Sequence, residues 1–158
     1  MSRLPALGPR GEGWVVIQLL LLGLVVVLGP LAPAYRGPWF VELALVGGLL
    51  ALAGLVLATK GLVDLRDALT PLPHPRDGAQ LVSHGAYRVV RHPIYGGIIL
   101  GSAGYALVLG SPAALLATVG LLVFFRLKSA REEVWLRQRY PGYDEYASRV
   151  RRLIPFVY

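Results

Sequence analysis

Long apolar segments set the fold class of this chain. The first two have close to the roughly 20 residues that a helix needs to cross about 30 Å of hydrocarbon. Two shorter apolar segments follow, and a helix that continues past the last of them would lengthen it. The four segments lie at about 14–31, 39–59, 94–109 and 113–125. We therefore expect an all-α integral membrane protein with about four transmembrane helices in one domain over residues 1–158.

The composition supports this class. Hydrophobic residues make up 55% of the chain and charged residues 16%, which is too apolar for an ordinary soluble domain. The absence of cysteine excludes disulfides, thiolate metal sites and cysteine nucleophiles, and the three histidines have no carboxylate at ligand spacing. The net charge of +7 would also be typical of a protein that binds nucleic acid. Because the basic residues are confined to alternate loops, they favour membrane topology and no nucleic-acid partner.

The first apolar segment has an alternative interpretation as a signal peptide. Arg3 and Arg10 precede it, and Ala32-Pro33-Ala34 resembles a small-x-small cleavage site. The segment is long for a signal peptide, and Pro33 lies inside the candidate site. We therefore favour a membrane span.

The basic residues predict the orientation of the helices. The N-terminal tail holds two of them, the central loop five and the C-terminal region eight, whereas the two opposite connections hold only Arg36. The positive-inside rule then places both termini in the cytoplasm. We expect an inner membrane of the bacterial type.

A basic stretch in the centre of the chain predicts a helix start. Pro93 suits the first helical position because it lacks an N–H, which leaves His92 as the cap. The free N–H groups and the positive helix end would then lie among Arg88, Arg91 and His92, where they could receive a carboxylate or phosphate. Before this stretch, helical spacing continues to Leu69, three prolines end the helix, and residues 76–78 predict a turn.

Small residues predict how the helices pack. Gly110-Ser111-Pro112 is a tight connection, so we expect the fourth helix to return beside the third and to continue to about Arg139. Small residues that permit close contact occur on the second and third helices at Gly47, Gly48, Ala51, Gly54 and Ala58, and at Gly97, Gly101 and Gly104.

The extension of the fourth helix has two interpretations. Lys128, Glu132, Trp135, Leu136 and Arg139 share one helical face. Taken alone, the charges here are typical of a solvated helix with a surface ion pair. A break at residues 141–142 and a last short helix follow.

Several spaced motifs occur in order over the C-terminal half. They are Leu81-Val82, Gly85-x-Tyr87-Arg88, Arg91-His92-Pro93-x-Tyr95-x-Gly97, Glu132-Glu133-x-x-Leu136, Tyr143-x-x-Tyr146 and Ile154-Pro155. Their order and gaps resemble the isoprenylcysteine carboxyl methyltransferase family and its phospholipid methyltransferase relatives, in a small bacterial or archaeal form. The first two apolar segments are hydrophobic but contribute nothing to this resemblance.

The resemblance implies methyl transfer from S-adenosylmethionine to a lipophilic acceptor at the cytoplasmic membrane face. The acceptor would be an isoprenyl-cysteine-like carboxylate or a related lipid, and the cofactor region would comprise residues 80–97 and 126–155. Lys128 and Glu132 would be catalytic; the family usually has arginine at the first position, and lysine cannot form a bidentate fork with a carboxylate. The residues that match the family's cofactor pocket are Gln80, Leu81, Val82, Tyr87, His92, Pro93, Ile94, Tyr95 and Glu132.

The residue types fit this chemistry independently. The helix start suits the cofactor's carboxylate, tyrosine rings suit its adenine and sulfonium, and Glu132 suits its hydroxyl or amino groups. A single displacement needs alignment and desolvation rather than a nucleophilic side chain. The chain has no Gly-x-Gly-x-x-Gly after a predicted strand, which argues against a soluble Rossmann-type methyltransferase.

Three other functions stay open from the sequence. One is a phospholipid amine N-methyltransferase, in which Lys128 or Arg91 would meet a phosphate. Another is a non-catalytic membrane interaction module of the same fold. The third is a nicotinamide-dependent reductase of a related membrane fold, for which the chain is short.

Overall fold

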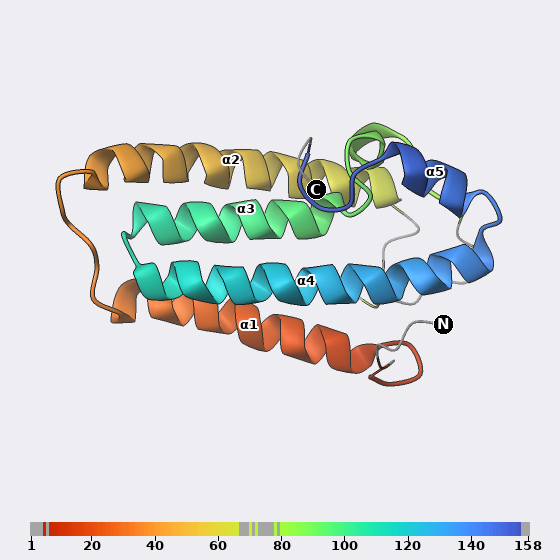
Figure 1. Cartoon of the computed structure of the whole chain (residues 1–158), viewed down its shortest axis with the longest axis horizontal. Coiled ribbons are helices and arrows are strands. Elements are labelled where there is room, and N and C mark those ends of the chain that lie inside the picture. The colour runs from red at the N-terminus through yellow and green to blue at the C-terminus, as the bar shows by residue number, and fades with distance from the viewer. Residues whose placement is uncertain are drawn as a thin grey trace.

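The computed structural model is a layered bundle of four long helices with a small helical cap at one end (Figure 1). It describes residues 5, 7–66, 70, 72, 78 and 80–155. The helices lie side by side in the order α2, α3, α4 and α1. The elements are α1 (Glu12–Leu31), α2 (Phe40–Leu65), the 3-10 helix η2 (Gly85–Arg88), α3 (Pro93–Val108), α4 (Pro112–Arg139) and α5 (Tyr143–Arg149).

The helix bounds confirm the predicted membrane architecture. Among the described residues, α1, α2 and α4 are long and apolar enough to cross a membrane, and α3 is a shorter apolar helix. The fourth helix is continuous to Arg139, as predicted. The second ends at Leu65, where Arg66 has a φ of 39°. The expected extension over residues 67–69, the prolines at 71, 73 and 75, and residues 76–77 of the expected turn lie outside the described residues.

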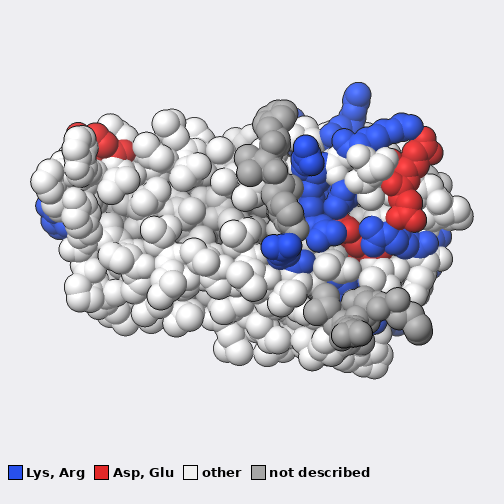
Figure 2. Space-filling model, in the orientation of Figure 1, with Lys and Arg blue, Asp and Glu red and all other residues white. Residues whose placement is uncertain are grey.

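Charge and apolar surface separate along the bundle. Lysine, arginine and acidic side chains gather mainly at the end that carries α5, and the long middle of the molecule is nearly free of them on the face shown (Figure 2). Many large apolar side chains of α1 and α2 are exposed along that middle, including Leu20 at 69% and Leu49 at 69%. This surface is suited to lipid contact.

Glycines bring α2 and α3 into close backbone contact. A Cβ on Gly54 would lie 2.5 Å from both the Gly97 oxygen and the Gly101 nitrogen, and one on Gly61 would lie 2.9 Å from the Pro93 ring. These two contacts are seven residues apart on α2, and the predicted Ala58 lies between them, with its nitrogen 2.6 Å from where a Cβ on Gly97 would be. Gly48 and Gly101 have open space at the Cβ position. The contact of Gly61 with Pro93 fixes the start of α3 against α2.

The opposite end of the bundle is closed by the predicted tight turn. Gly110 has a φ of +59°, and its oxygen accepts a hydrogen bond of 2.6 Å from the Tyr35 N–H. Arg36 donates to the Leu109 oxygen at 2.9 Å. Ser111 caps α4 by accepting from the Ala114 N–H at 3.2 Å. These bonds join the two connections and hold α4 antiparallel to α3.

A proline inside α1 leaves one backbone carbonyl without its intrahelical hydrogen bond, and a side chain of α3 supplies the missing donor. Pro30 has no N–H, so the carbonyl of Val26 loses its intrahelical donor. The Tyr105 hydroxyl donates to that oxygen at 2.9 Å, and the Tyr105 ring occupies the space beside Gly29. In a membrane, an unpaired carbonyl must find such a partner within the protein.

Replacing Tyr105 with phenylalanine is therefore expected to lower the free energy of unfolding by about 1–3 kcal/mol, because the Val26 carbonyl loses its donor in an apolar setting. Denaturant unfolding in detergent micelles would measure this. Pro30→Ala supplies an N–H to the same carbonyl, so the double variant should recover most of the loss. Equal instability of the single and double variants would contradict this explanation.

Candidate active site

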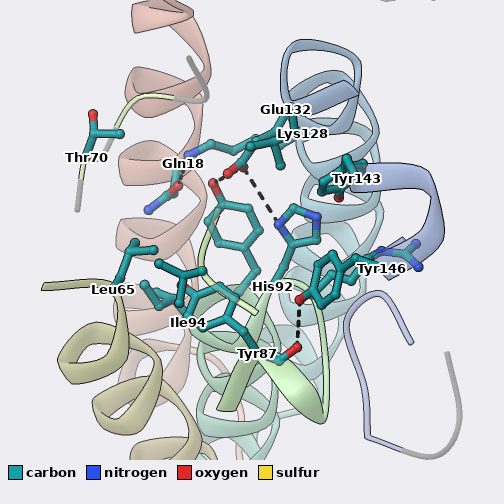
Figure 3. Close-up of a pocket in the computed structure, with 14 residues that line it drawn as sticks. Gln18, Leu65, Thr70, Tyr87, His92, Ile94, Lys128, Glu132, Tyr143 and Tyr146 are labelled. Carbon is teal, nitrogen blue, oxygen red and sulfur yellow. Dashed lines mark hydrogen bonds and ion pairs between the residues drawn. The ribbon is translucent and has the colours of Figure 1, made fainter. Parts of the chain in front are cut away.

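A cavity of about 260 Å³ lies at the end of the bundle where α3 begins (Figure 3). Because α2 and α4 continue beyond the start of α3, side chains from several elements meet there. The volume is close to the lower end of the roughly 300–1,000 Å³ typical of ligand pockets. The lining residues are Gln18, Leu65, Thr70, Val82, Tyr87, Arg91, His92, Ile94, Tyr95, Lys128, Glu132, Leu136, Tyr143 and Tyr146.

Most of the site residues expected from the sequence line this cavity. Pro93 is buried without lining it, Leu81 lines a separate hollow with Arg88 and Tyr146, and Gln80 is exposed and lines neither. The expected residues that the structure brings together are Val82, Tyr87, His92, Ile94, Tyr95, Lys128 and Glu132.

The helix start at His92 is as predicted. His92 is the N-cap and Pro93 occupies the first turn. The N–H groups of Arg91 and His92 donate to the oxygens of Arg151 and Arg152, at 2.8 and 3.0 Å. These two N–H groups are therefore engaged with the C-terminal residues 151 and 152. By helix geometry, the first-turn donors without an intrahelical acceptor belong to Ile94 and Tyr95.

Glu132 is held at the edge of the cavity by an aromatic column. The Tyr95 hydroxyl donates to Glu132 Oε2 at 2.8 Å, and His92 Nδ1 lies 3.8 Å from the same oxygen. The Tyr95 ring stacks between His92 and Phe125, with centroid distances of 5.5 and 4.7 Å. Because the Glu132 side chain is 22% exposed, its carboxylate is fixed but accessible.

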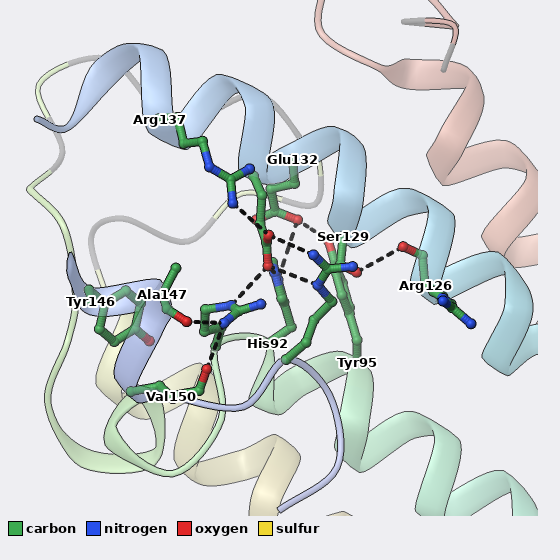
Figure 4. Close-up of polar contacts among 12 residues, drawn as sticks. His92, Tyr95, Arg126, Ser129, Glu132, Arg137, Tyr146, Ala147 and Val150 are labelled. Atoms are coloured by element: carbon green, nitrogen blue, oxygen red, sulfur yellow. Dashed lines mark hydrogen bonds and ion pairs between the residues drawn. The ribbon is translucent and has the colours of Figure 1, made fainter. Parts of the chain in front are cut away.

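The neighbouring Glu133 has a different environment (Figure 4). Its side chain is fully buried, and its carboxylate accepts from Arg91 at 2.9 Å and from Arg152 at 3.0 and 3.1 Å. His92 Nε2 lies 3.3 Å away and Arg137 3.5 Å away. Glu133 therefore joins α4, the start of α3 and the C-terminal segment. The interpretation of these charges as a solvated surface is wrong for this residue.

Arg91 extends that junction to α5. Its Nη1 donates to the oxygens of Ala147 and Val150, at 2.5 and 2.6 Å, while its Nε contacts Glu133. Figure 4 shows these two backbone oxygens directed at the cluster. The cap over the cavity is thus tied to the start of α3 by one guanidinium.

The 3-10 helix η2 places Tyr87 at the cavity. Asp64 of α2 accepts from the Ala86 N–H at 2.7 Å, and Gly85 has a φ of +57°, where a Cβ would overlap the Asp64 carboxylate. The Tyr146 hydroxyl donates to the Tyr87 oxygen at 2.6 Å. Burial raises the pKa of both tyrosines, so their hydroxyls stay protonated at neutral pH.

Tyr143, the first residue of α5, lines the cavity and has a buried hydroxyl. The side chain is 1% exposed and lines the cavity, and its hydroxyl has no hydrogen-bond partner within the part of the chain that the structure describes. Burial raises the pKa of Tyr143, which keeps the proton on this oxygen. A buried donor without a partner is costly, so the site favours a ligand or water that accepts from it.

Lys128 lies on another wall of the cavity, beside α1. It is 1% exposed, its Nζ donates to Gln18 Oε1 at 2.5 Å, and it lies 5.0 Å from the centroid of the Tyr95 ring. The geometry therefore holds a buried cation within one turn of Glu132.

Sequence reasoning did not assign several lining residues to the site. Gln18 had a usable signal, since it is a single amide in an apolar span. Tyr143 and Tyr146 stood in a recognised motif but were interpreted as packing. Nothing in the sequence distinguished the buried Glu133 from Glu132, because their partners come from segments far apart along the chain.

Comparison with known proteins gives consistent matches. Residues 43–142 match the phospholipid methyltransferase family. Two proteins of Oryza sativa, from subsp. indica and subsp. japonica, are each named probable protein-S-isoprenylcysteine O-methyltransferase. Each is 33% identical over 131 residues, covering 80% of this chain and 68% of the rice protein. Protein-S-isoprenylcysteine O-methyltransferase A of Arabidopsis thaliana is 31% identical over 134 residues, covering 80% of this chain and 66% of that protein.

Proposed function

This chain belongs to the phospholipid methyltransferase family and is an integral membrane methyltransferase that uses S-adenosylmethionine, and we propose that it methylates an isoprenyl-cysteine-like carboxylate. The observation that carries the proposal is the single cavity that joins the start of α3, Glu132 and the buried cation of Lys128. The family and the relatives' names argue against a non-catalytic module and against a reductase.

The cavity residues fit the cofactor. The unpartnered Tyr143 hydroxyl supplies a donor, and the first-turn N–H groups of Ile94 and Tyr95 lie at the positive end of a helix, which favours a carboxylate. The faces of Tyr87 and Tyr95 suit an adenine ring or a sulfonium. Glu132 Oε2 is engaged by Tyr95, and its Oε1 accepts no hydrogen bond from the described residues, so it can accept from ligand hydroxyl or amino groups.

The protein's contribution to the reaction is alignment and exclusion of water. When bound, the cofactor supplies a methyl group on a positively charged sulfur. Tyr95 and His92 hold Glu132 in place, and Arg91 and Tyr146 hold the cap and η2 over the cavity. Lys128 orients the acceptor oxygen by its charge. When the cofactor and the acceptor are both held in a site that excludes water, the bimolecular methyl transfer becomes an effectively unimolecular step within one complex.

The charge of the cavity wall favours a carboxylate over an amine acceptor. An ionised carboxylate is nucleophilic without losing a proton, and the Lys128 ammonium stabilises it. An amine acceptor would have to approach as the neutral form beside a buried cation. Phospholipid amine N-methylation is therefore the second candidate, supported by the name of the family match.

We further propose that residues 1–158 form one methyltransferase domain in a bacterial-type inner membrane, with both termini and the active site in the cytoplasm. Fifteen of the sixteen basic residues belong to the tail, the central loop and the C-terminal region. The cavity lies at the charged end shown in Figure 2. The positive-inside rule assigns that end to the cytoplasm.

The direct test is methyl transfer from labelled S-adenosylmethionine by the purified protein in detergent. We expect label in N-acetyl-S-prenyl-cysteine and none in phosphatidylethanolamine or a small thiol. Label in phosphatidylethanolamine alone would replace the proposed acceptor by the second candidate. Failure of the purified, folded protein to bind the cofactor in calorimetry would overturn the placement of the site.

The Tyr143 hydroxyl offers a specific test of cofactor placement. Tyr143→Phe removes only the unpartnered oxygen, so the Kd for S-adenosylmethionine is expected to rise by about 3- to 10-fold, the equivalent of one neutral hydrogen bond. Isothermal calorimetry would measure this. Tyr140→Phe, just outside the cavity lining, serves as a matched control. An unchanged Kd for Tyr143→Phe would place the cofactor away from this oxygen.

A further inference from the structure

A hollow separate from the active-site cavity is formed by the end of α5, the C-terminal segment that follows it and one residue before α3. Its volume is about 390 Å³. Among the seven described residues that line it, four are arginines and none is acidic. The four are Arg91, Arg149, Arg151 and Arg152. Several guanidiniums around one hollow favour an anionic ligand.

The carboxylate that contacts two of these arginines does not balance their charge. Glu133 is fully buried and pairs with both Arg91 and Arg152, so two guanidiniums share one negative charge. Each also has a terminal nitrogen that makes no hydrogen bond to a described residue, Nη2 of Arg91 and Nη1 of Arg152. Both guanidiniums are thus held in place and keep a donor for a further acceptor.

The other two arginines are exposed and differ in their partners. Arg149 pairs with Glu145 on the surface. The Arg151 side chain forms no hydrogen bond or ion pair with any residue that the structure describes, although its backbone oxygen accepts from the Arg91 N–H at 2.8 Å. The backbone of Arg151 is therefore fixed, while its guanidinium is available to a ligand.

The hollow lies where the chain passes from the charged end into the apolar bundle. Residues 151 and 152 run beside the start of α3, a short apolar helix. The next residue, Leu153, is fully buried in the hydrophobic core, and a Cβ on Gly96 would overlap its oxygen. Figure 2 shows the basic side chains next to the uncharged middle of the molecule. A ligand with a charged head and an apolar chain fits this position.

We propose that this hollow binds the phosphate of an anionic phospholipid, with Arg151 as the exposed contact and Arg91 and Arg152 as the inner ones. The planar guanidinium matches phosphate oxygens, and several arginines at a membrane surface favour an anionic head group over a zwitterionic one. The inference does not depend on which acceptor is methylated. Arg91 lines both the hollow and the cavity, so the bound lipid would contact the side chain that holds the cap.

Arg151→Gln tests the site, because it removes one charge without removing a partner of any described side chain. Calorimetric titration of the protein in a neutral detergent with dioctanoyl-phosphatidylglycerol would measure the Kd. We expect the Kd to rise by about fivefold, as for the loss of one arginine at an anionic surface. The Arg149→Gln/Arg151→Gln double variant should raise it further. Thermal unfolding and the Kd for S-adenosylmethionine should be unchanged in both variants.

Arg126→Gln is the matched control, because it removes the same charge from an exposed position of α4 outside the hollow. At physiological salt a distant charge is screened, so this variant should keep the Kd within about twofold. Equal effects of Arg151→Gln and Arg126→Gln would show a diffuse attraction to the whole basic surface and would overturn the site.

Two further titrations identify the ligand. Dioctanoyl-phosphatidylcholine carries the same phosphate and chains without net charge, so equal binding of this lipid would overturn the recognition of an anionic head group. Inorganic phosphate lacks the apolar chains and should bind about tenfold more weakly or less. Equal binding of phosphate and the anionic lipid would assign the hollow to a free phosphate and overturn the lipid as its ligand.

Discussion

Replacing Glu132 with alanine is expected to weaken S-adenosylmethionine binding by about 10- to 100-fold, because a carboxylate makes charge-assisted hydrogen bonds of about 1.5–3 kcal/mol. The Glu132 side chain is partly exposed at the cavity edge. Its Oε2 is engaged by Tyr95, which orients the group without consuming its other oxygen. The variant should fold, since the carboxylate carries no part of the arginine cluster around Glu133.

Calorimetry on the detergent-solubilised protein would measure the binding constant, and thermal unfolding would report the fold. Glu145→Ala is a matched control, because Glu145 is exposed and pairs with Arg149 on the surface. Glu132→Gln keeps an acceptor for Tyr95 and should lose less affinity than the alanine variant. If Glu132→Ala bound the cofactor as tightly as the unmodified protein, the cofactor would not contact this carboxylate.

The overall fold was predictable because its signals are local. Apolar length defined the spans, Pro93 marked a helix start, and Gly110-Ser111-Pro112 marked a reversal. Of the small residues predicted to pack on these two helices, Gly48 and Gly101 have open space at the Cβ position, because helical periodicity alone does not say which of several glycines faces the partner. That choice depends on the rotation of one helix against the other, which tertiary packing decides.

The candidate site was predictable only in part. The motif residues His92, Tyr95 and Glu132 meet in one cavity, as the resemblance implied. Gln18 joins them because α1 packs beside α4, a pairing between the first and last long helices that no local pattern encodes. The N–H of His92 donates to the oxygen of Arg152, a contact that the sequence around the helix start did not predict. In each case the deciding partner comes from a distant part of the chain.

Glu133→Gln is expected to lower the free energy of unfolding by about 3–5 kcal/mol, the cost of removing one partner from a buried ion pair. The carboxylate is fully buried and pairs with Arg91 and Arg152 within 3.1 Å. Without it, these guanidiniums are left with uncompensated charge near the start of α3. The release of Arg91 would also loosen the cap, since the same side chain holds the oxygens of Ala147 and Val150.

Denaturant unfolding in micelles would measure the change, with Arg137→Ala as a control, because that arginine is 41% exposed and lies at 3.5 Å from Glu133. The control should cost less than about 1 kcal/mol. Cofactor affinity of the folded fraction should fall less for Glu133→Gln than for Glu132→Ala. Substitution of Glu132 is thus expected to weaken cofactor binding, whereas substitution of the adjacent Glu133 is expected to lower the stability of the fold. A stable Glu133→Gln variant would show that the arginine cluster does not hold the C-terminal segment in place.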